Sequence, residues 1–330
     1  MRVKITYLFF VTFSIVSCFN QTHAQVTFTL QQALVTAREN NPILRTELFN
    51  VSIAQADIVS AKLRPNLILN NQTLQNGQPS HLPGGNVDFS SGQSRQVWWQ
   101  LTKPFQIAGQ RSYQIDFANE NVSLAQKNYL ETERTIFSGV AAKWLEVWAA
   151  QKQLEIIDKA KNNIQSLVET NQLRYKNQMI TQTDVFRSEL LLKQYELQSN
   201  TVKQEIANRL TELKFLLGVQ EDMTVDMKDD FLFAIPDNVD SLYNQSLNSR
   251  SDIGVMKSII EVSKSNIKLQ RSLAYPQPEL GVIWNPQNNV PYYGIYATVR
   301  LPVFDRNQGE IKKSFLLKEK AEKELYTIQT

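Results

Sequence analysis

The side chains that could carry chemistry are few and far apart in this 330-residue chain. The sequence contains two histidines, His23 and His81, and a single cysteine, Cys18. His81 lies in a stretch rich in Gly, Pro and Ser, where Asp88 is the nearest carboxylate. His81 and Asp88 could bind a metal ion together, or His81 could be an ordinary solvated residue of a loop. We favour the second interpretation. No metal site is therefore predicted.

Catalytic arrangements do not stand out in the sequence either. It shows no Ser/His/Asp order, no Gly-rich phosphate loop and no paired carboxylates in a pocket-like context. Asp305 and Glu310 flank a glycine and could mimic an acid/base pair. A strand-to-helix connection with an acidic residue at the helix N-terminus is favoured, because the helix dipole stabilises negative charge there. We expect neither an enzyme nor a cofactor.

Composition indicates an ordered protein with one large or two modest domains. The chain is 42% hydrophobic and 20% charged. Lys and Arg number 35 against 32 Asp and Glu, which gives a net charge of +3. This balance is too even and too dispersed for a nucleic-acid binder, so no nucleic-acid partner is expected.

Residues 1–24 are predicted to be an export signal. A basic start at Arg2 and Lys4 precedes an apolar stretch over 5–16, and Thr22-His23-Ala24 fits a small-x-small cleavage site. Alternatively, Ile15-Val16-Ser17-Cys18 resembles a bacterial lipobox, which would make Cys18 an acylated first residue. We favour the interpretation that Cys18 is an unmodified residue in the apolar core of the signal. The mature chain would then contain no disulfide and no thiolate metal site.

Two segments about 210 residues apart have the same layout, which indicates an internal repeat. The first begins with a helix over 29–62, which Pro65 ends. Strands over 66–74 and 95–103 follow, separated by a Gly/Pro/Ser/Asn-rich loop at 76–94. The helix face with spacings of three and four comprises Leu44, Leu48, Val51, Ala54, Ile58 and Ala61.

The second segment repeats this order. A helix over 242–273, ended by two prolines, precedes a strand at 279–284, a turn at 285–291 and a strand at 293–301. The helix face comprises Ile253, Met256, Ile260, Ser263, Ile267 and Ala274.

Two long helices are predicted between the repeats, over 110–173 and 183–217, with a short turn at 176–181. Gly218 ends the second helix as a C-cap glycine. A helix of roughly 60 residues is ~90 Å long, more than a globular core requires. The first helix carries a coiled-coil seam at Ile115, Ala118, Val122, Ala125, Tyr129, Thr132 and Ile136. Its apolar face then widens to Val140, Ala141, Trp144, Leu145 and Trp148, which we interpret as packing residues.

Four strands in one exported chain cannot close a membrane barrel, which needs at least about eight strands. Several copies would have to pool their strands, and three copies would supply about twelve. Aromatic side chains in both hairpins suit the interfacial girdles of such a wall. These membrane-strand aromatics are Trp98, Trp99, Tyr292, Tyr293 and Tyr296.

Several short motifs occur in a definite order along the chain. They are Asn40-Asn41-Pro42, Pro104-Phe105, Gly109-Gln110-Arg111, Arg174-Tyr175-Lys176, Thr183-Asp184-Val185, Glu189 and segment 301–311, LPVFDRNQGEI. Together they resemble the TolC family of outer-membrane efflux factors, and segment 301–311 resembles the strand-to-helix connection of its cation-efflux (CzcC-like) branch. The resemblance extends from Phe28 over nearly the whole mature chain.

The resemblance implies a fold that is mainly α with a small β part. A long α-helical hairpin would be a stave of a periplasmic α-barrel, and two β-hairpins would contribute four strands to a trimeric 12-stranded outer-membrane β-barrel. It implies a homotrimer in outer-membrane lipid, with a periplasmic adaptor (membrane fusion) protein and an inner-membrane pump as partners. The chain would be a passive conduit for metal cations or drugs.

The turn between the long helices is the adaptor-contacting tip that the resemblance implies, at Gln178, Met179, Ile180 and Thr181. The family usually has Gly-Leu where this chain has Gln178-Met179. Asp184 could line the periplasmic entrance or cap the returning helix. The cap is favoured because Thr181 and Thr183 stand beside it.

The predicted domains are the signal at 1–24, a first repeat at 25–218, a connector at 219–241 and an incomplete second repeat at 242–330. By the symmetry of the repeats, we expect a second helical hairpin of roughly 90 residues to be missing. That loss would leave the stripe around Val140, Trp144 and Trp148 exposed.

Two other functions stay open. A periplasmic adaptor is also exported and contains a helical hairpin, but it should show paired lipoyl-like half-motifs, which we do not find. A structural coiled-coil protein without a pore would not need two aromatic strand pairs at matched positions.

Overall fold

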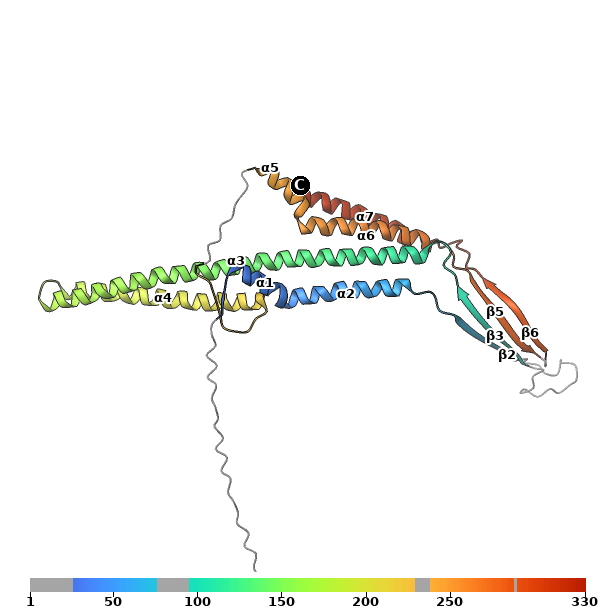
Figure 1. Cartoon of the computed structure of the whole chain (residues 1–330), viewed down its shortest axis with the longest axis horizontal. Coiled ribbons are helices and arrows are strands. Elements are labelled where there is room, and N and C mark those ends of the chain that lie inside the picture. Colours follow the sequence, from blue (N-terminus) through green and yellow to red (C-terminus); the bar gives the residue numbers. More distant parts are fainter. Residues whose placement is uncertain (1–25, 76–94, 229–237, 288–289) are drawn as a thin grey trace, which may run out of the picture. The chain divides into compact units, whose positions relative to one another are not determined.

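The computed structural model describes residues 26–75, 95–228, 238–287 and 290–330 (Figure 1). The predicted signal with Cys18 and the loop with His81 lie outside these ranges. The chain divides into two compact units. The hairpin unit comprises Met1–Leu34 and Ala142–Asp229, and the sheet unit comprises Val35–Ala141 and Asp230–Thr330. Helices predominate and strands are few, so the predicted class, mainly α with a small β part, is confirmed.

The hairpin unit contains two antiparallel helices, as predicted. Helix α3 (Gln110–Lys176) supplies its C-terminal part, and α4 (Gln182–Leu217) returns beside it (Figure 1). Buried residues of α4 recur at heptad spacings, which is the pattern of a coiled-coil seam. They are Val185, Ser188, Leu192, Ser199, Val202, Leu213 and Leu217. Side-chain bonds join the two helices, including Ser199 Oγ to Asp158 Oδ1 at 2.9 Å and Gln172 Nε2 to Glu189 Oε1 at 3.0 Å.

A short parallel sheet that the sequence did not reveal completes the hairpin unit. Strand β1 (Val26–Phe28) pairs with β4 (Met223–Val225), which lies inside the predicted connector. Trp144 is fully buried and donates a hydrogen bond from Nε1 to the carbonyl oxygen of Phe28 at 3.0 Å. Val140 is also fully buried. The expected exposure of this stripe is therefore wrong for these residues, and for Trp144 the reason is the contact with β1.

In the sheet unit, each of the two long predicted helices is divided by one extended residue. The first consists of α1 (Leu30–Asn40) and α2 (Pro42–Lys62), and the second of α5 (Val239–Ser249) and α6 (Ser251–Leu273). The dividing residues have almost the same backbone angles, φ −59° and ψ 124° at Asn41 and φ −63° and ψ 122° at Arg250. The two single helices predicted over 29–62 and 242–273 are therefore wrong in the same way.

The first break has a clear local cause. Pro42 has no N–H and fits the first position of a helix, while the residue before a proline avoids helical angles. The Asn41 side chain then caps α2, because its Oδ1 accepts hydrogen bonds from the N–H groups of Ile43 at 2.8 Å and Leu44 at 3.2 Å. At the second break Arg250 makes no side-chain cap, and its guanidinium pairs with Asp252 at 2.6 Å.

Both breaks are tied to the same turn of α3. Next to the first break, Arg38 Nε donates to Glu133 Oε1 at 2.7 Å. Next to the second, Ser251 Oγ donates to Glu131 Oε2 at 2.6 Å. Two acidic residues of one helix thus bind the end of α1 before the first break and the start of α6 after the second.

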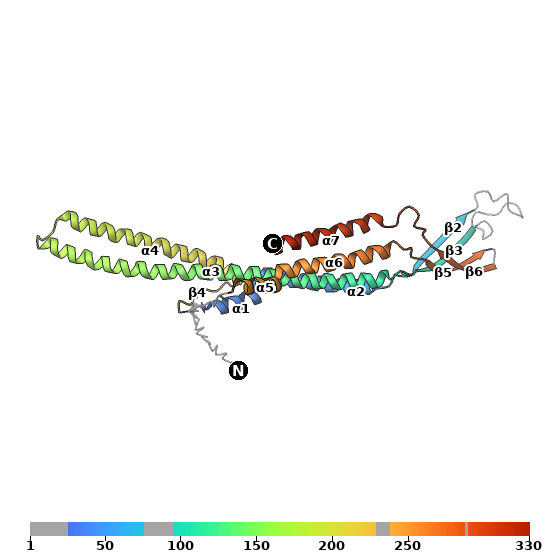
Figure 2. The same cartoon turned by 90° about the horizontal axis from the view of Figure 1, so that it is seen from above.

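Helix α6 packs beside α7 (Gln308–Gln329), as the view in Figure 2 shows. The predicted apolar face of α6 is confirmed at Ile253, Ile260 and Ile267, which are buried. On α2, the predicted face is confirmed at Leu44, Ala54 and Ala61, but Leu48 is 51% exposed. None of the helices in the described ranges combines the length and apolar character needed to cross a bilayer.

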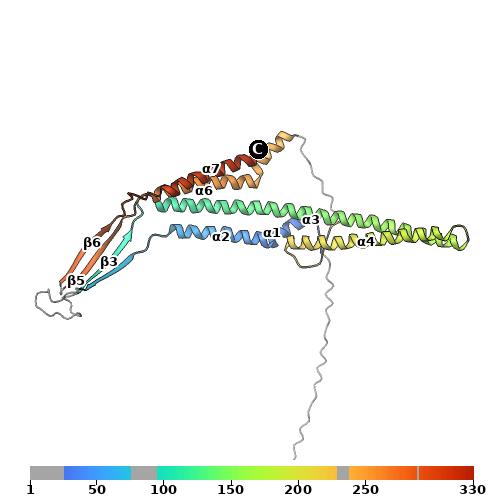
Figure 3. The same ribbon diagram turned by 180° about the vertical axis from the view of Figure 1, so that it is seen from behind.

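Four antiparallel strands form a sheet in the order β2-β3-β5-β6 (Figure 3). They are β2 (Ile68–Gln75), β3 (Arg95–Pro104), β5 (Glu279–Gln287) and β6 (Val290–Thr298). The turn predicted at 285–291 is wrong, because pairing continues through Pro286 and Pro291 to Gln287 and Val290. Pro286 is tolerated since the ladder with β3 stops earlier, at Trp284, so no hydrogen bond to β3 is lost. The last strand also ends at Thr298, short of the predicted residue 301.

A single glycine allows the two hairpins to join. Gly281 of β5 pairs with Thr102 of β3, whose side chain is fully buried. A Cβ atom at Gly281 would lie 2.3 Å from the Leu101 carbonyl oxygen and 2.7 Å from Thr102 Cγ2. Only glycine therefore fits where the strands approach so closely.

Candidate functional site

The two faces of the sheet differ sharply in polarity. Because strand side chains alternate, the pairing register assigns each residue to one face. One row across all four strands is Leu69, Leu101, Val282 and Ile295, and the next is Asn71, Trp99, Trp284 and Tyr293. We call this side the apolar face; its large hydrophobic residues are Leu69, Val97, Trp99, Leu101, Leu280, Val282, Trp284, Tyr293 and Ile295.

The opposite side, the polar face, carries mostly amides and hydroxyls. Its polar residues are Asn70, Gln72, Gln96, Gln100, Thr102, Glu279, Asn285 and Thr298. Tyr296 Oη lies 3.0 Å from Thr298 Oγ1 on this face. Apolar side chains on one face and mainly polar side chains on the other are typical of strands that separate lipid from water. Strand β2 departs from this pattern, because Asn71 and Thr73 lie on the apolar face and Ile68 and Leu74 on the polar face.

The five aromatic residues singled out in the sequence do not share one face. Trp99 and Tyr293 lie on the apolar face, whereas Trp98, Tyr292 and Tyr296 lie on the polar face. Sequence reasoning missed Trp284, which pairs with Trp99 on one side and Tyr293 on the other. It stood at the end of a predicted strand, and only the register between the hairpins places it in this row.

The apolar face is exposed to an extent that is unusual for a folded chain. Ile295 is 89% exposed and Tyr293 78%, and no described element of the sheet unit covers them. The outer strands β2 and β6 each pair on one side only, within the described residues. A large exposed apolar surface beside unpaired strand edges indicates contact with a membrane or with other chains.

The turn between α3 and α4 is the second candidate surface. Helix α3 ends in a Schellman motif, in which the N–H of Met179 bonds to the carbonyl of Arg174 at 2.9 Å and that of Gln178 to the carbonyl of Tyr175 at 2.8 Å. Gln178 adopts φ 61°, a left-handed conformation that favours glycine. Met179 is 74% exposed. The turn thus presents an apolar side chain on a fixed backbone.

The returning helix starts with a capping box. Thr181 is the N-cap, with its Oγ1 accepting from the N–H of Asp184 at 3.3 Å, and the Thr181 N–H donates to Asp184 Oδ2 at 3.1 Å. Hydrogen bonds from the Thr181 hydroxyl and backbone lower the pKa of Asp184. The predicted capping role of Asp184 is confirmed, as the third residue of the helix rather than the cap itself.

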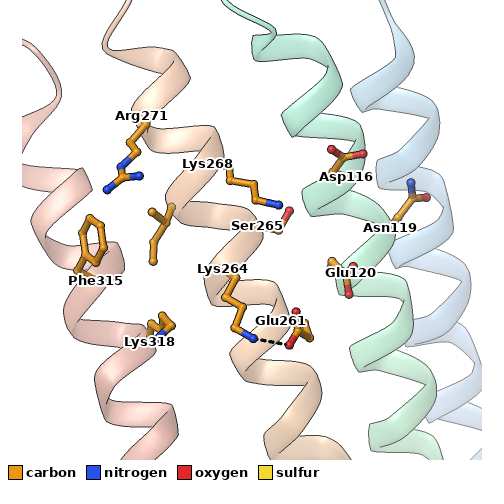
Figure 4. A pocket seen from close by; sticks show the side chains of 11 residues that line it. Asp116, Asn119, Glu120, Glu261, Lys264, Ser265, Lys268, Arg271, Phe315 and Lys318 are labelled. Carbon is orange, nitrogen blue, oxygen red and sulfur yellow. Dashed lines mark hydrogen bonds and ion pairs between the residues drawn. The ribbon is translucent and has the colours of Figure 1, made fainter.

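The sheet unit also has a charged groove along α6, of about 550 Å³ (Figure 4). Asp116 and Glu120 of α3 form one wall, and Phe315 of α7 lies on the other side. Lys264 Nζ pairs with Glu261 Oε1 at 2.7 Å on the groove floor. Charges of both signs alternate here, so the groove is a solvated surface without preference for one ion type.

The carboxylates of Asp305 and Glu310 lie in the connection from β6 to α7 and at the start of that helix. Within the described ranges, no group of three or more metal-binding side chains lies together. Glu310 lies in the first turn of α7, and Asp305 Oδ1 accepts from the N–H of Asn307 at 2.9 Å. These two carboxylates therefore stabilise the connection and the helix start, as the sequence predicts.

Comparison with known proteins gives these surfaces a context. Residues 33–219 match the family model described as outer membrane efflux protein. The pyoverdine export outer membrane protein OpmQ of Pseudomonas putida is 23% identical over 320 residues, covering 90% of this chain and 66% of that protein.

Two solved structures share the fold. A membrane protein from Pseudomonas aeruginosa has a TM-score of 0.72 at 16% identity, over 91% of this chain and 72% of that one. Crystal structures of CusC, described in terms of folding and transmembrane channel formation, give 0.69 at 15% identity with the same coverages, 91% and 72%. Since the family model matches more than half of the sequence, the chain belongs to the outer membrane efflux protein family.

Proposed function

We propose that the chain is the outer-membrane channel component of a tripartite efflux system, a passive conduit and not an enzyme. The sheet carries this proposal, because one exposed face is apolar and the other polar. In lipid, every backbone N–H and carbonyl must be paired within protein. The outer edges of β2 and β6 would therefore need strands from other copies of the chain.

The proposed assembly is a homotrimer. Four strands per copy fall short of the roughly eight that the smallest membrane barrels use, whereas three copies supply about twelve. Pairing of β6 in one copy with β2 in the next is a head-to-tail contact, which closes into a ring when the rotation fits. The apolar face would then meet outer-membrane lipid and the polar face would line the water-filled interior.

The helices are proposed to form the periplasmic part of the conduit. Helix α3 has 67 residues, which corresponds to a length of about 100 Å. We assign contact with a periplasmic adaptor to Gln178, Met179, Ile180 and Thr181, because this turn is well capped and exposes Met179. An inner-membrane pump would supply the energy.

Cysteine cross-linking between copies tests the assembly. In a Cys18→Ser background, Ile295→Cys on β6 is combined in turn with Leu69→Cys, Asn71→Cys and Thr73→Cys on β2, all on the apolar face. Oxidation of outer membranes should yield disulfide-linked dimers and trimers for at least one pair. Recovery of the chain as a periplasmic monomer without cross-links would contradict the proposal and favour an adaptor or a coiled-coil protein.

The tip assignment has its own test. Met179→Asp should weaken photo-cross-linking between the channel and its adaptor, because a charge would replace the most exposed apolar side chain of the turn. Leu197→Asp is a matched control on α4, since Leu197 is 70% exposed but lies outside the turn. Equal loss in both variants would argue against a specific contact at the turn.

We propose metal cations as the cargo class, on the resemblance of segment 301–311 to the cation-efflux branch. The OpmQ relative is named for pyoverdine export, so a siderophore is the competing cargo. A deletion strain that carries the gene should regain growth on excess zinc or cobalt. Restored siderophore secretion without metal resistance would overturn this cargo.

A further inference from the structure

The loop after β6 exposes an apolar cluster that the strands do not account for. In residues 299–307, here called the junction loop, Phe304 is 94% exposed, Leu301 75% and Val303 60%. Exposure of three large apolar side chains this close together to water is unfavourable, because each would be stabilised by burial. The cluster is therefore expected to meet something apolar.

The loop holds these side chains outward through a dense set of hydrogen bonds. Arg306 Nε donates to the Pro302 carbonyl at 3.0 Å, and Gln308 Nε2 donates to the Phe304 carbonyl at 3.2 Å. Asn307 Nδ2 donates to the Gln270 carbonyl at 2.9 Å, which fixes the loop to the end of α6. The exposure of Phe304 thus belongs to an ordered segment.

The cluster also extends the apolar face to the height that a membrane requires. From Val290 to Thr298, β6 spans about 26 Å at roughly 3.3 Å per residue. At a tilt of about 40° that is a height of about 20 Å, short of the ~25 Å apolar band of membrane barrels. Val299 and Leu301 continue the odd-numbered apolar series and are exposed. Extension to Leu301 gives about 36 Å along the chain and a height of about 28 Å, which is enough for this band.

Charge around the loop fits a surface of phosphates. Arg300 and Arg306 are exposed on either side of the cluster. Lys103 Nζ lies 5.8 Å from the ring centroid of Phe105, which is itself 40% exposed. Asp305 is the one carboxylate of the junction loop and is engaged by a backbone N–H. Aromatic rings next to basic side chains are typical of the boundary between acyl chains and headgroups.

We propose that the junction loop seats in the headgroup layer of the membrane leaflet at the helix end of the sheet. Leu301, Val303 and Phe304 enter the acyl boundary, while Arg306 contacts lipid phosphates. This inference rests on the proposed function and adds the contact that fixes how deep the sheet sits in the bilayer.

Spin labels at three depths test the inference. The full chain in a Cys18→Ser background receives one label at Ile295→Cys, Phe304→Cys or Lys312→Cys, and is reconstituted in phosphatidylethanolamine and phosphatidylglycerol vesicles. Accessibility to oxygen, which concentrates in acyl chains, is compared with accessibility to a water-soluble nickel chelate. The oxygen-to-nickel ratio should fall in the order Ile295, Phe304, Lys312, with the Phe304 label at headgroup depth.

The three labels separate this inference from the proposed function. If the Ile295 label is in lipid but the Phe304 label is as nickel-accessible as that at Lys312, the junction loop is in water and the inference fails alone. A Phe304 label that is immobile and shielded from both reagents would show that protein covers the loop, which also overturns the inference. Nickel access at Ile295 would sink the proposed function itself.

Discussion

The four-stranded sheet and the turn between α3 and α4 both expose apolar side chains, but they complete their hydrogen bonding in opposite ways. The turn satisfies its groups within a few residues, through the Schellman motif at Gln178 and the capping box at Thr181. The sheet leaves one side of β2 and of β6 unpaired within the described residues and leaves Ile295 almost fully exposed. Local sequence therefore suffices to form the turn, whereas the sheet needs an environment that the chain alone does not supply.

The largest expected effect comes from breaking the joint between the two hairpins of the sheet. Gly281→Val would place a side chain against the Leu101 carbonyl oxygen and Thr102, and these atoms cannot move away without breaking the strand pairing. We expect the free energy of unfolding to fall by more than about 4 kcal/mol, which is enough to stop assembly. The yield of heat-sensitive trimers on gels measures it.

Gly294→Val is the matched control for this change. Gly294 lies in β6, and a Cβ atom there meets nothing within 4 Å. This variant should assemble normally. Similar trimer yields for the two variants would show that the close approach at Gly281 does not hold the hairpins together.

A smaller effect should distinguish the two faces of the sheet. In the proposed barrel the apolar face meets lipid and Ile295 lies near mid-depth, so Ile295→Arg should lower the free energy of unfolding in a bilayer by about 2–4 kcal/mol. Gln100→Arg on the polar face should cost less than about 1 kcal/mol. Urea unfolding from vesicles, followed by tryptophan fluorescence, gives both values, and equal costs would contradict the assignment of the faces.

At the turn, removal of the Thr181 N-cap should lower the stability of the first turn of α4 by about 1 kcal/mol. Thr181→Ala loses the hydroxyl that accepts from the Asp184 N–H, so the first turn of α4 should fray. Hydrogen exchange of amides 182–185 measures the change. Thr183→Ala is the control, since Thr183 is exposed and is not the N-cap residue.

The same cap should respond to acid. The hydrogen bonds from Thr181 lower the pKa of Asp184 in the folded chain. The Asp184 carboxylate therefore contributes its full stabilisation of the cap above the unfolded pKa of about 4, and this stabilisation is lost as the pH falls through the lower folded pKa. Protection factors of these amides should decrease below about pH 4 in the parent chain and stay flat in Asp184→Asn. A parallel decrease in both would assign the effect to another group.

The smallest effect should come from Gln178→Gly, which we expect to stabilise the turn by about 0.5 kcal/mol. Relief of the left-handed strain is partly offset by the greater freedom of glycine in the unfolded chain. Helix α4 ends in the same motif with glycine, since Gly218 adopts φ 67°. Gly218→Gln should destabilise by a similar amount, and thermal denaturation of both variants would show whether the two helix ends are equivalent.

Features that depend on neighbouring residues were predictable from the sequence. Gly218 and the threonines of the turn identified helix ends, and alternation identified both hairpins. The breaks at Asn41 and Arg250 were not found, because one extended residue hardly disturbs helical spacing. Ala33, Ala37 and Leu44, all fully buried, keep near-helical intervals across the first break.

Features that join distant segments could not be predicted. Strands β1 and β4 have three residues each, too few for a periodic signal, and they are far apart in the sequence. The alignment of Trp284 with Trp99 depends on how the hairpins meet at Gly281, which is a long-range property. The sequence shows which side chains of each strand are apolar or polar. The division of the whole sheet into two continuous faces depends on the pairing register between the strands.

The bonds from Arg38 to Glu133 and from Ser251 to Glu131 limit how the two helix pairs α1–α2 and α5–α6 can change. Each pair is bonded to an acidic residue in the same short stretch of α3. A one-residue insertion between Gln110 and Glu131 would rotate both carboxylates by about 100° relative to the preceding turns of the helix. Such an insertion would release both helix pairs at once, so the loops of the two pairs can change separately, whereas the length of this stretch of α3 has to stay constant.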